Sequence, residues 1–457
     1  MPDAPLVSVI VLNFNGAAIL PRCLDHLLAQ TYTARELIVV DNASSDGSDA
    51  VLAAYAARGV RVVASPVNRG CAGGRNAGLE VAHGEIVAFM DNDGYADPRW
   101  LAEAVVALSG DAAVGAIAPL VFFDRQGLVL NGAGGTLNRR GYGGDHCFQE
   151  PYEFARLPHA VLYPMGCGMV VRRAVLDAMG GFDEALFNYY DDVEVGVWSW
   201  RLGLQVLCAP RAWVDHGFSS TDAINRNKIA LCERNRIRTI LKYFPAHLLP
   251  GWALRELGSL LRPRATWAWA IPWRAWSWNL AHLGSALRRR RRYGPRRGLF
   301  DPLLHPSWGS FPPPRPTHHL GRPDPAAAAA SLAFESGADA APLSYGWYPP
   351  EQDGAVAMRW TTAHAAAFVR MPARATQLEC EWRAPRGDQE TTLRLRRLDD
   401  LAVQWEWRAW PGTTWARRRV ACHLPPGTYE LQICSQPAAA DADGRELGVG
   451  IARLALI

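Results

Sequence analysis

The sequence predicts an α/β domain with a mostly parallel sheet, then a helical segment rich in tryptophan and arginine, and a C-terminal antiparallel β-sandwich. Residues 7–118 alternate between strand-like and helix-like segments, which is typical of a parallel sheet covered by helices. Tryptophans and arginines are mixed in residues 252–297, and after about residue 343 apolar and polar residues alternate with period 2. A chain of 457 residues, 49% of them hydrophobic, is long enough for several folded domains.

The first domain is expected over residues 1–250. Its predicted strands are Val7–Leu12, Leu37–Val40, Val60–Ala64 and Ile86–Met90, and its predicted helices are Ala17–Ala29, Ala50–Ala57 and Asn76–Ala82. Asn13, Asp41 and Asp91 each directly follow one of these strands. Because ligands of such sheets bind beyond the carboxyl ends of the strands, these three polar residues should meet at one rim.

The stretch "FMDNDG", residues 89–94, ends a buried strand in two carboxylates, Asp91 and Asp93, with Asn92 between them. Side chains two residues apart in an extended segment point to the same side. Two like charges on one side repel each other unless a cation or a shared proton holds them together. This stretch therefore predicts a site for a hard divalent metal.

The stretch "VVDNASSDGS", residues 39–48, follows the second strand. Asp41 and Asn42 lie where hydrogen bonds could recognise a base or a ribose. Ser44 and Ser45 are suited to cap the next helix. Capping would explain the serines, but it does not explain an acid placed at the strand end.

The stretch "NRGCAGGRNAGL", residues 68–79, surrounds Arg75 and Asn76 with glycines, including Gly70. Glycine lets the backbone approach a ligand closely, and the N-terminus of a following helix favours phosphate. The stretch is not a Walker A loop, because no Gly-Lys-Ser/Thr follows. A glycine-rich turn without a ligand gives the same pattern, so both interpretations stay open.

A second acidic cluster, "NYYDDVEVGVW", places Asp191, Asp192 and Glu194 at the start of a predicted helix. Acids in a first helical turn also gain roughly 0.3–1 kcal/mol each from the helix dipole, which would account for the cluster without chemistry. Further along, His216 ends a short apolar segment. A single histidine usually serves packing or the surface, but at a strand end in a chain that needs metal ligands it is a candidate ligand.

Taken in order and spacing, these stretches resemble the family 2 glycosyltransferases, which have the GT-A fold, over roughly residues 6–245. The matching stretches are "VSVIVLNFN", "ELIVVDNASSDGS", "NRGCAGGRNAGL", "VAFMDNDG" and "GCGMVVRR…GGFDEALFNYYDDVEVGVWSWRLGLQV", closed by His216. The resemblance is strongest to the bacterial branch that makes rhamnosyl and galactofuranosyl linkages in surface polysaccharides. It implies a nucleotide-sugar-binding domain.

The resemblance also assigns roles to residues. It implies that Asp91, Asp93 and His216 hold Mn²⁺ or Mg²⁺, and that Asp192 is the catalytic base of an inverting transfer. The implied contacts to the nucleotide-sugar are Asn13, Asp41, Asn42, Gly70, Arg75, Asn76, Asp91 and Asn92. Arg75 departs from the family, in which asparagine is common, and Asp191-Asp192 replaces the more usual Glu-Asp. The first change puts a phosphate role of Arg75 in doubt, whereas the second keeps the carboxylate.

The expected function is transfer of a sugar, with rhamnose favoured, from a dTDP- or UDP-sugar to a glycan or lipid-linked acceptor in cell-surface polysaccharide synthesis. A non-catalytic glycan-binding or scaffolding protein with the same fold is the alternative from another class. The presence of Asp91, Asp93, Asp192 and His216 argues against it. A nucleotidyltransferase is disfavoured because its glycine- and lysine-rich activation loop is missing near the first strand.

Three further regions are expected after residue 250. Residues 251–300 form either a helical segment at an anionic membrane surface or a helical subdomain whose tryptophans pack under the first domain. Residues 301–340, rich in proline and alanine, form a linker. Residues 341–457 form the β-sandwich. Its tryptophans could bind carbohydrate, although period-2 aromatic residues more often pack in a core; they are Trp405, Trp407, Trp410 and Trp415.

Composition predicts the compartment. Nine cysteines without a Cys-X-X-Cys pair favour reduced thiols. Neither a secretory signal nor an apolar run of about 18 residues is expected, so we predict a cytoplasmic protein with the inner face of the cell membrane as a candidate binding surface. The net charge of +4 is modest, and although Arg288–Arg292 are consecutive, no nucleic-acid-binding motif accompanies them.

Overall fold

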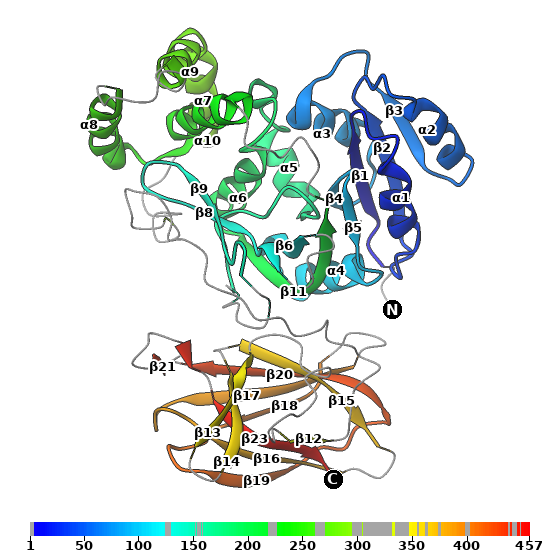
Figure 1. Cartoon of the computed structure of the whole chain (residues 1–457), viewed down its shortest axis with the longest axis vertical. Helices are drawn as coiled ribbons and strands as arrows, with labels where there is room; N and C mark the ends of the chain where they lie inside the picture. The colour runs from blue at the N-terminus through cyan, green and yellow to red at the C-terminus, as the bar shows by residue number, and fades with distance from the viewer. Residues whose placement is uncertain are drawn as a thin grey trace. The chain divides into compact units, whose positions relative to one another are not determined.

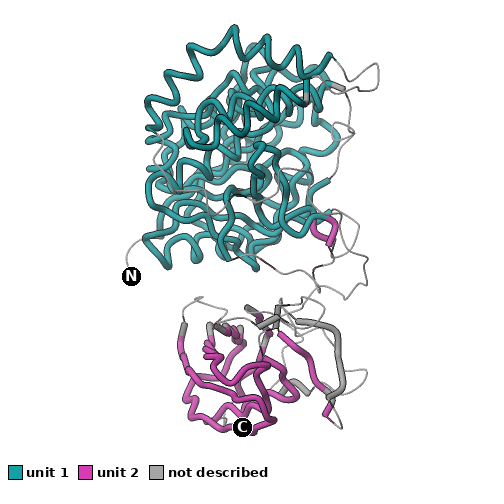
Figure 2. The backbone as a smooth tube through the Cα atoms, turned by 90° about the vertical axis from the view of Figure 1, so that its left-hand side faces the viewer, with its two compact units in different colours: residues 1–124, 131–148, 158–313 teal, residues 125–130, 149–157, 314–457 magenta. Residues whose placement is uncertain are grey.

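The computed structural model describes most of the first domain and most of the sandwich strands. The described residues are 4–123, 129–150, 152, 157, 159–217, 226–260, 270–294, 304, 331–333, 347–353, 356–361, 364–372, 376–397, 403–436, 439–440, 446–447 and 449–457. Most of the predicted linker, residues 301–340, lies outside these ranges. The chain divides into two compact units, which are Met1–Asp124 with Asn131–Phe148 and Pro158–Pro313, and Arg125–Leu130 with Gln149–Leu157 and Pro314–Ile457 (Figure 2). The boundaries expected at residues 250, 300 and 340 remain predictions.

The first half of the large sheet follows the predicted alternation of strands and helices (Figure 1). Its strands are β1 (Val7–Asn13), β2 (Arg35–Asp41), β3 (Arg61–Ala64) and β4 (Ile86–Asp91), and its helices are α1 (Leu20–Leu28), α2 (Ser48–Ala56) and α3 (Gly70–Val81). The four strands are parallel, in the order β3-β2-β1-β4. In this register Asn13 pairs with Asp41 and Leu12 with Asp91, so the polar strand ends do meet at one rim.

The second half of the sheet mixes strand directions. It contains β5 (Gly94–Ala96), β6 (Val114–Phe123), β10 (Val170–Arg172) and β11 (Gln205–His216), with α4 (Trp100–Ser109), α5 (Arg173–Met179) and α6 (Asp191–Arg201) between them. The short strand β10 inserts between β4 and β6 and is antiparallel to both. Strands β6 and β11 are parallel, and β5 closes this edge antiparallel to β11. Strand β7 (Leu130–Gly132) pairs with β6, and β8 (Gly135–Leu137) forms a hairpin with β9 (Gly143–Asp145). The mixed, mostly parallel sheet covered by helices agrees with the predicted GT-A fold.

Both faces of this sheet are buried, which explains why its strands read as nearly continuous apolar runs. In β1, Val9 and Val11 belong to one core cluster, and Ile10 belongs to the cluster on the other face. The alternation follows from the two-residue period of a strand. A sheet covered on both sides leaves its strand ends as the place where a ligand can reach polar groups.

Four helices follow the sheet: α7 (Arg226–Tyr243), α8 (Leu249–Leu260), α9 (Ala270–Ala281) and α10 (Leu283–Tyr293). Trp252 of α8 is buried, and its ring centroid lies 5.5 Å from that of Trp276 in α9. Tyr293 of α10 packs edge-on against Trp198 and Tyr243 in the same core as α6. In the described ranges, no helix has the length and apolar character needed to cross a membrane.

A buried ionic network joins α6 to α7. Lys242 Nζ lies 2.7 Å from Asp183 Oδ2 and donates to Glu194, and Arg238 Nε donates to Asp183 Oδ2 over 2.7 Å. All four side chains are almost completely buried. Burial would raise the pKa of Asp183, but Lys242 and Arg238 hold it well below its ordinary value. Removing one partner from such a network leaves an uncompensated buried charge, which typically costs about 3–5 kcal/mol.

The C-terminal unit contains two antiparallel sheets, as predicted. One has the order β13-β14-β23-β16-β19 with β12 paired to β23, and the other has the order β15-β20-β17-β18. Their strands, with the small pair β21–β22, are β12 (Ser331–Ala333), β13 (Trp347–Asp353), β14 (Val356–Thr361), β15 (His364–Met371), β16 (Gln377–Arg383), β17 (Glu390–Arg397), β18 (Val403–Ala409), β19 (Ala416–Ala421), β20 (Gly427–Gln436), β21 (Ala439–Ala440), β22 (Glu446–Leu447) and β23 (Gly450–Leu456). One core cluster takes residues from both sheets, including Cys380 and Leu454 from the first and Leu393 and Leu431 from the second.

Most of the sandwich tryptophans named above serve packing. Trp407 stacks on Trp382 with ring centroids 5.4 Å apart, and Trp405 Nε1 donates to the carbonyl of Ala421 over 3.0 Å. Trp415 packs against the small cluster around Trp360, whereas Trp410 is 61% exposed. The packing interpretation therefore accounts for three of these four tryptophans.

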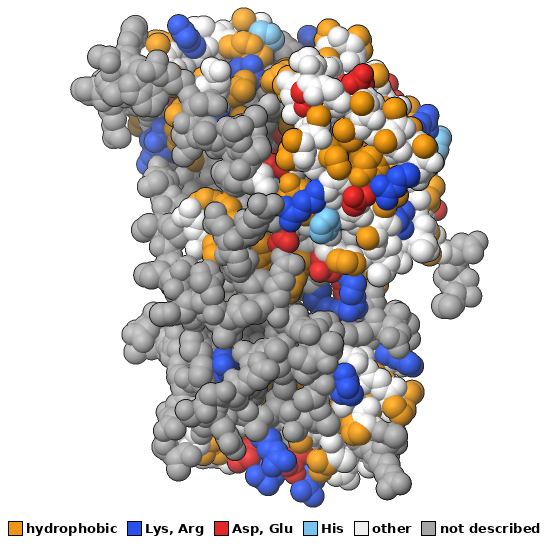
Figure 3. All heavy atoms as spheres, turned by 45° about the vertical axis from the view of Figure 1, so that its right-hand side comes forward, with side chains coloured by type: hydrophobic (Ala, Val, Ile, Leu, Met, Phe, Trp, Pro, Cys, Tyr) orange, Lys and Arg blue, Asp and Glu red, His pale blue; other side chains and the backbone are white. Residues whose placement is uncertain are grey.

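On the face of the molecule shown in Figure 3, basic and acidic side chains are interspersed among apolar ones.

Candidate active site

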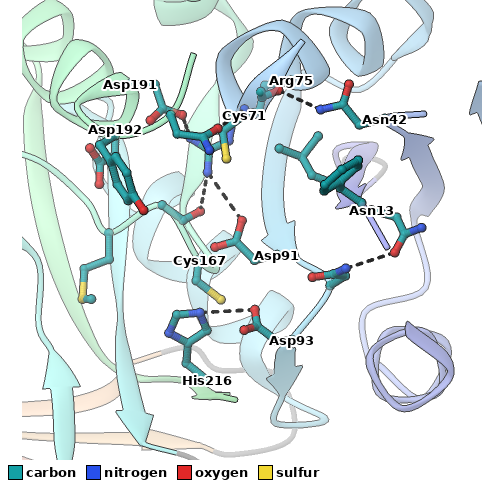
Figure 4. A pocket seen from close by; sticks show the side chains of 18 of the residues that line it. Asn13, Asn42, Cys71, Arg75, Asp91, Asp93, Cys167, Asp191, Asp192 and His216 are labelled. Carbon is teal, nitrogen blue, oxygen red and sulfur yellow. Dashed lines mark hydrogen bonds and ion pairs between the residues drawn. The ribbon is translucent and has the colours of Figure 1, made fainter. Parts of the chain in front are cut away.

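A cavity of about 350 Å³ opens at the carboxyl ends of the central strands (Figure 4). Its lining residues are Leu12, Asn13, Phe14, Asn42, Asn68, Gly70, Cys71, Arg75, Asp91, Asn92, Asp93, Met165, Gly166, Cys167, Asn188, Tyr189, Asp191, Asp192 and His216. Nine of the eleven residues predicted from the sequence are in this set, and Asp41 and Asn76 are not. The strand ends, the start of α3 and the start of α6 therefore enclose one space.

The ends of β1 and β2 are tied together by side chains. Asn13 Nδ2 donates to Asp41 Oδ1 over 3.0 Å, and Asn13 Oδ1 accepts from Asn92 Nδ2 over 3.0 Å. Asp41 also accepts from the hydroxyl of Ser44 over 2.6 Å. Asp41 does not line the cavity itself, but it holds Asn13 and the loop after β2 in place.

Asn42 connects the end of β2 to the start of α3. Its Nδ2 donates to Asn68 Oδ1 and to the carbonyl of Gly70, each over 3.1 Å, and its Oδ1 accepts from the backbone N–H of Arg69 over 2.9 Å. The side chain is buried. Its hydrogen bonds are made within the protein, so Asn42 shapes the donor side of the cavity.

Helix α3 begins at Gly70, six residues before the predicted start at Asn76, so the glycine-rich stretch is helical. Gly70 has φ +65°, and a Cβ atom there would lie 2.4 Å from the carbonyl oxygen of Phe187. The N–H groups of Gly70, Cys71 and Ala72 donate to Asn68, Asn188 and Phe187 respectively. The donors of Cys71 and Ala72 therefore hold the loop before α6, whereas the donor of Gly70 closes the turn at Asn68. A phosphate role for Gly70 remains a prediction.

Asn76 is not among the residues that line the cavity. Its Oδ1 accepts from the backbone N–H of Phe182 over 2.8 Å, and its Nδ2 donates to the carbonyl of Phe182 over 3.1 Å. It also donates to Glu184. The structure thus gives Asn76 a part in fixing the chain before α6, and its predicted contact with the nucleotide-sugar stays untested.

Asp91 and Asp93 both reach the cavity, but not through strand alternation. Asp91 is the last residue of β4, and Asn92 and Asp93 form a turn that leads into β5. The expectation that both acids sit on one extended segment is therefore wrong. The turn brings the two carboxylates to the same corner, and Figure 4 shows both pointing into it.

His216, the last residue of β11, completes this corner. Its Nε2 lies 3.3 Å from Asp93 Oδ1, and its Nδ1 lies 3.2 Å from Oδ1 of the buried Asn131 in β7. When Nδ1–H donates a hydrogen bond to Asn131 Oδ1, the other ring nitrogen, Nε2, keeps a lone pair that faces the carboxylates and can bind a metal. Two carboxylates and an imidazole nitrogen are a donor set that fits a divalent cation.

Asn131→Ala is expected to weaken metal binding by about 10–100-fold, because the amide that orients the His216 ring is lost. Titration calorimetry with Mn²⁺ on the two proteins measures this change. Asn138→Ala, in the loop between β8 and β9, is the control for a buried asparagine outside the cavity. Equal Mn²⁺ affinity in Asn131→Ala and wild type would contradict the orienting role.

The opposite wall carries Asp191 and Asp192, with different partners. Arg75 donates to the buried Asp191, donates to the carbonyl of Gly166 over 3.2 Å, and lies 3.7 Å from Asp91. Burial alone would lower the pKa of Arg75, but Asp191 and Asp91 raise it above its ordinary value. Arg75 is therefore a fixed charge between the two acidic walls of the cavity.

Asp192 is only partly buried and faces the cavity. Its Oδ1 accepts from the backbone N–H of Val193 over 2.8 Å. Desolvation and the neighbouring charge of Asp191 raise the pKa of Asp192 to about 8, with Arg75 acting in the opposite direction. A carboxylate with a raised pKa is suited to accept a proton near neutral pH.

The loop before α6 has an unusual backbone. Phe187, Tyr189 and Tyr190 have φ values of 63°, 70° and 70°, in the left-handed region that costs non-glycine residues about 1–3 kcal/mol each. The buried Asn235 of α7 holds this loop, because its Nδ2 lies 2.9, 2.7 and 3.0 Å from the carbonyl oxygens of Leu186, Asn188 and Tyr189. The position of Asp192 therefore depends on α7.

Four side chains important for this geometry were not identified from the sequence: Phe14, Asn131, Cys167 and Asn235. Phe14 directly follows β1, next to the predicted Asn13, and its side chain is 47% exposed at the cavity. Its position beside a predicted rim residue was the one available signal. The other three act through contacts between distant segments. No local pattern could have pointed to them.

Comparisons with known proteins find glycosyltransferases among the sequences similar to this chain. The glycosyl transferase family 2 model matches residues 8–180. An uncharacterized glycosyltransferase of Nostoc sp. is 28% identical over 190 residues, which cover 41% of this chain and 56% of the relative. A UDP-Glc:α-D-GlcNAc-diphosphoundecaprenol β-1,3-glucosyltransferase of Escherichia coli is 32% identical over 91 residues, 20% of this chain and 36% of the relative. The chain thus spans about half or less of these curated relatives.

Solved structures with a similar chain path include a mannosyltransferase from Pyrobaculum calidifontis in complex with GDP-Man and Mn²⁺. It is 20% identical, the alignment covers 64% of this chain and 88% of that chain, and the TM-score is 0.40. The S. aureus protein TarS in complex with UDP-GlcNAc is 20% identical, with 63% and 89% covered and a TM-score of 0.40. Residues 8–180, which include the strand ends with Asp91 and Asp93, therefore match glycosyl transferase family 2.

Proposed function

We propose that the protein is an inverting, metal-dependent glycosyltransferase that moves a sugar from a nucleotide-sugar to a glycan or lipid-linked acceptor. One observation carries this proposal. A single cavity holds a ligand corner of Asp91, Asp93 and His216, and a separate carboxylate, Asp192, whose pKa is raised to about 8. The first set suits a cation with a diphosphate, and the second suits removal of a proton from a hydroxyl group.

Asp192 acts as the base. It takes the proton of the acceptor hydroxyl while the hydroxyl oxygen forms a bond to the anomeric carbon of the sugar. The bond from that carbon to the diphosphate oxygen breaks in the same displacement, so the anomeric centre is inverted. Asp191 cannot replace Asp192, because Arg75 holds it in a buried ion pair.

The other wall serves the leaving group. A divalent cation bound by Asp91, Asp93 and His216 would stabilise the negative charge that develops on the departing nucleoside diphosphate. Arg75 balances part of the charge of Asp91 and Asp191. Asn13 and Asn92 are hydrogen-bonded to each other and line the same cavity. The exposed ring of Phe14 is available to stack on the base of the nucleotide.

The substrates are proposed from relatives. The E. coli relative carries UDP-Glc and a lipid-linked diphosphate in its name, and a Rhizobium meliloti relative, 38% identical over 89 residues, is named a succinoglycan biosynthesis protein. These names support a UDP- or dTDP-sugar donor, a lipid-linked or glycan acceptor, and a role in cell-surface polysaccharide synthesis. Rhamnose is the sugar favoured by the sequence resemblance.

A panel of UDP-, dTDP- and GDP-sugars tests the proposal. With Mn²⁺ or Mg²⁺ present, we expect at least one donor to raise the melting temperature of the protein and to be hydrolysed slowly when no acceptor is added. Chelation of the metal should remove both effects. A non-catalytic glycan-binding protein would show neither, and that result would overturn the proposal.

The transfer rate is expected to rise with pH and to level off above a midpoint of about 8, because only the carboxylate form of Asp192 accepts a proton. Initial rates measured as a function of pH at saturating donor give this midpoint. In Asp191→Asn the midpoint should move to lower pH, since the charge of Asp191 helps to raise the pKa of Asp192. A pH-independent rate, or a shift to higher pH, would contradict the assignment of Asp192 as the base.

We also propose that helices α8–α10 bind an anionic membrane surface. Trp252 and Trp276 pack inward, but the exposed sides of these helices carry large apolar side chains. These are Leu254, Leu257, Trp273, Leu280 and Leu287, with exposed fractions of 71%, 57%, 47%, 61% and 40%. Helix α10 also carries exposed arginines, including Arg288 and Arg291. The apolar side chains could insert into the membrane interface, and the arginines are attracted to negatively charged headgroups. Both effects favour binding to an anionic lipid surface.

Flotation with anionic vesicles should show binding that falls partly, but not wholly, as salt rises. Replacing both Arg288 and Arg291 with glutamine should weaken binding by about 2 kcal/mol, or roughly 30-fold, at ~1 kcal/mol per arginine. Arg289 and Arg290 are left intact because they contact Asp183 and the carbonyl of Leu241. Arg418→Gln in the sandwich is the control. If the wild type ignores these vesicles at low salt, α8–α10 are a packed subdomain only.

A further inference from the structure

Cys167 lies in the ligand corner of the cavity, although the sequence did not mark it as a ligand. Its Sγ, a carboxylate oxygen of Asp91 and a ring nitrogen of His216 all lie within 4.8 Å of one another. In Figure 4 the sulfur of Cys167 lies between the side chains of Asp91 and His216. Within the described ranges, three His, Cys, Asp or Glu side chains come together in this way only here.

The three side chains come from separate parts of the sheet. Asp91 ends β4, His216 ends β11, and Cys167 precedes β10, the strand inserted between β4 and β6. The backbone N–H of the next residue, Gly168, donates to the carbonyl of Phe89 over 2.8 Å, which fixes this turn against β4. Because β10 is inserted next to β4, the sulfur atom of Cys167 lies beside the carboxylate oxygen of Asp91 and the ring nitrogen of His216.

We propose that Cys167 is a metal ligand, and that the site accordingly prefers a transition-metal cation with affinity for sulfur, such as Co²⁺ or Zn²⁺, over Mg²⁺. Mg²⁺ strongly favours oxygen ligands in octahedral geometry, whereas imidazole and sulfur ligands suit transition metals. On binding, the thiol loses its proton to the buffer and the sulfur coordinates as thiolate. This inference rests on the metal-dependent function proposed above, and it specifies which cation serves that function.

The dimensions of the corner allow this arrangement. Metal–ligand bonds are about 2.0–2.3 Å long, so two ligand atoms on opposite sides of an ion lie up to about 4.5 Å apart. The ligand atoms of Asp91, Cys167 and His216 lie within 4.8 Å of one another. Shifts of a few tenths of an ångström would therefore bring them to bonding distance of one ion. Gly94 provides the space for the sulfur, since a Cβ there would lie 2.7 Å from Cys167 Sγ and 2.4 Å from Met90 Sδ. Asp93, 3.3 Å from His216 Nε2, is a further oxygen donor beside the group.

A buried cysteine is often only a small apolar side chain, and Cys167, which is 4% exposed, packs against Met90. Packing alone predicts no metal-dependent change at the sulfur. Coordination predicts a spectroscopic change that requires Cys167 and that no other cysteine can replace. The chain offers a matched comparison, because Cys71 lines the same cavity but is outside the three-ligand group.

The test is to load the full-length protein with Co²⁺ and to record its electronic absorption spectrum. The wild type and Cys71→Ser should both show a thiolate-to-cobalt charge-transfer band in the near ultraviolet, and Cys167→Ser should lack it. Calorimetry should show that Cys167→Ser lowers Co²⁺ affinity by at least about tenfold and leaves the weaker Mg²⁺ affinity unchanged. A wild-type spectrum without this band, or a band that persists in Cys167→Ser, would overturn the proposal.

The wild type alone provides a second measurement if Cys167→Ser does not fold. Calorimetry of Co²⁺ binding in two buffers with different ionisation enthalpies counts the protons released. At a pH where the imidazole of His216 is already neutral, coordination of the Cys167 thiol still requires the release of a proton. Binding of Co²⁺ without proton release would overturn the role of Cys167 and leave the metal-dependent function standing. Failure of Co²⁺ and of Mn²⁺ to bind, with or without nucleoside diphosphate, would overturn both the role of Cys167 and the metal-dependent function.

Discussion

Asp192→Asn is expected to leave donor and metal binding unchanged and to slow transfer by about 10²–10⁴-fold, the usual contribution of a positioned base. The amide has the shape of the carboxylate but cannot accept the proton of the acceptor hydroxyl. Initial transfer rates, with calorimetry of nucleoside diphosphate and Mn²⁺ on the same protein, separate the two effects. Because the loss lies in the chemical step, kcat should fall while the apparent affinity for the donor stays the same.

The matched control is Asp177→Asn, which removes a carboxylate from the exposed side of α5. It should transfer at the wild-type rate. Wild-type turnover in Asp192→Asn would show that the proton is accepted elsewhere in the cavity. A parallel loss of donor affinity would instead show that the change has disturbed the fold of the loop before α6.

Asp93→Ala is expected to remove metal-supported binding of the nucleoside diphosphate. Loss of an outer-shell partner typically costs 10–100-fold in metal affinity, so loss of a coordinating carboxylate should cost more than about 100-fold. Calorimetry with nucleoside diphosphate in the presence and absence of Mn²⁺ measures the supported part of the affinity. Binding that does not depend on Mn²⁺ should be unaffected or slightly improved, because a negative charge has been removed beside the diphosphate.

The control for this variant is Asp49→Ala, an exposed acid in the first turn of α2. It removes the same charge at a distance from the cavity and should bind like the wild type. If Asp93→Ala retains the full effect of Mn²⁺, the cation is held by other residues. The ligand corner would then need to be reassigned.

The rim of polar residues could be predicted from the sequence because it depends on a general property of parallel sheets. Asn13, Asp41 and Asp91 end strands that run in the same direction, so their meeting follows from the alternation of strands and helices. The sequence also predicted that Asp91 and Asp93 lie together, but for a reason that does not hold. Asp91 and Asp93 share the cavity through a turn, and the periodicity of an extended strand does not apply to a turn.

The parts that escaped prediction depend on contacts between segments far apart in the chain. The insertion of β10 between β4 and β6 leaves no local pattern, since a strand of three residues is too short to show a period. Asn131 meets His216 only because β7 pairs with β6, the neighbour of β11. Glu194 illustrates the same limit, because its position in a helical first turn gave no sign of its ion pair with Lys242.

The hold of Asn235 on the loop before α6 has a consequence for the order in which the site matures. The strand-end residues from Asn13 to Asp93, and then His216 of the ligand corner, are synthesised before Asn235, and β1, β2 and β4 can pair as soon as they are made. The strained loop at Phe187–Tyr190 has no support from α7 until Asn235 has been synthesised and has docked against its carbonyl groups. During synthesis, therefore, we expect the chain to be able to hold a nucleotide before it can transfer a sugar.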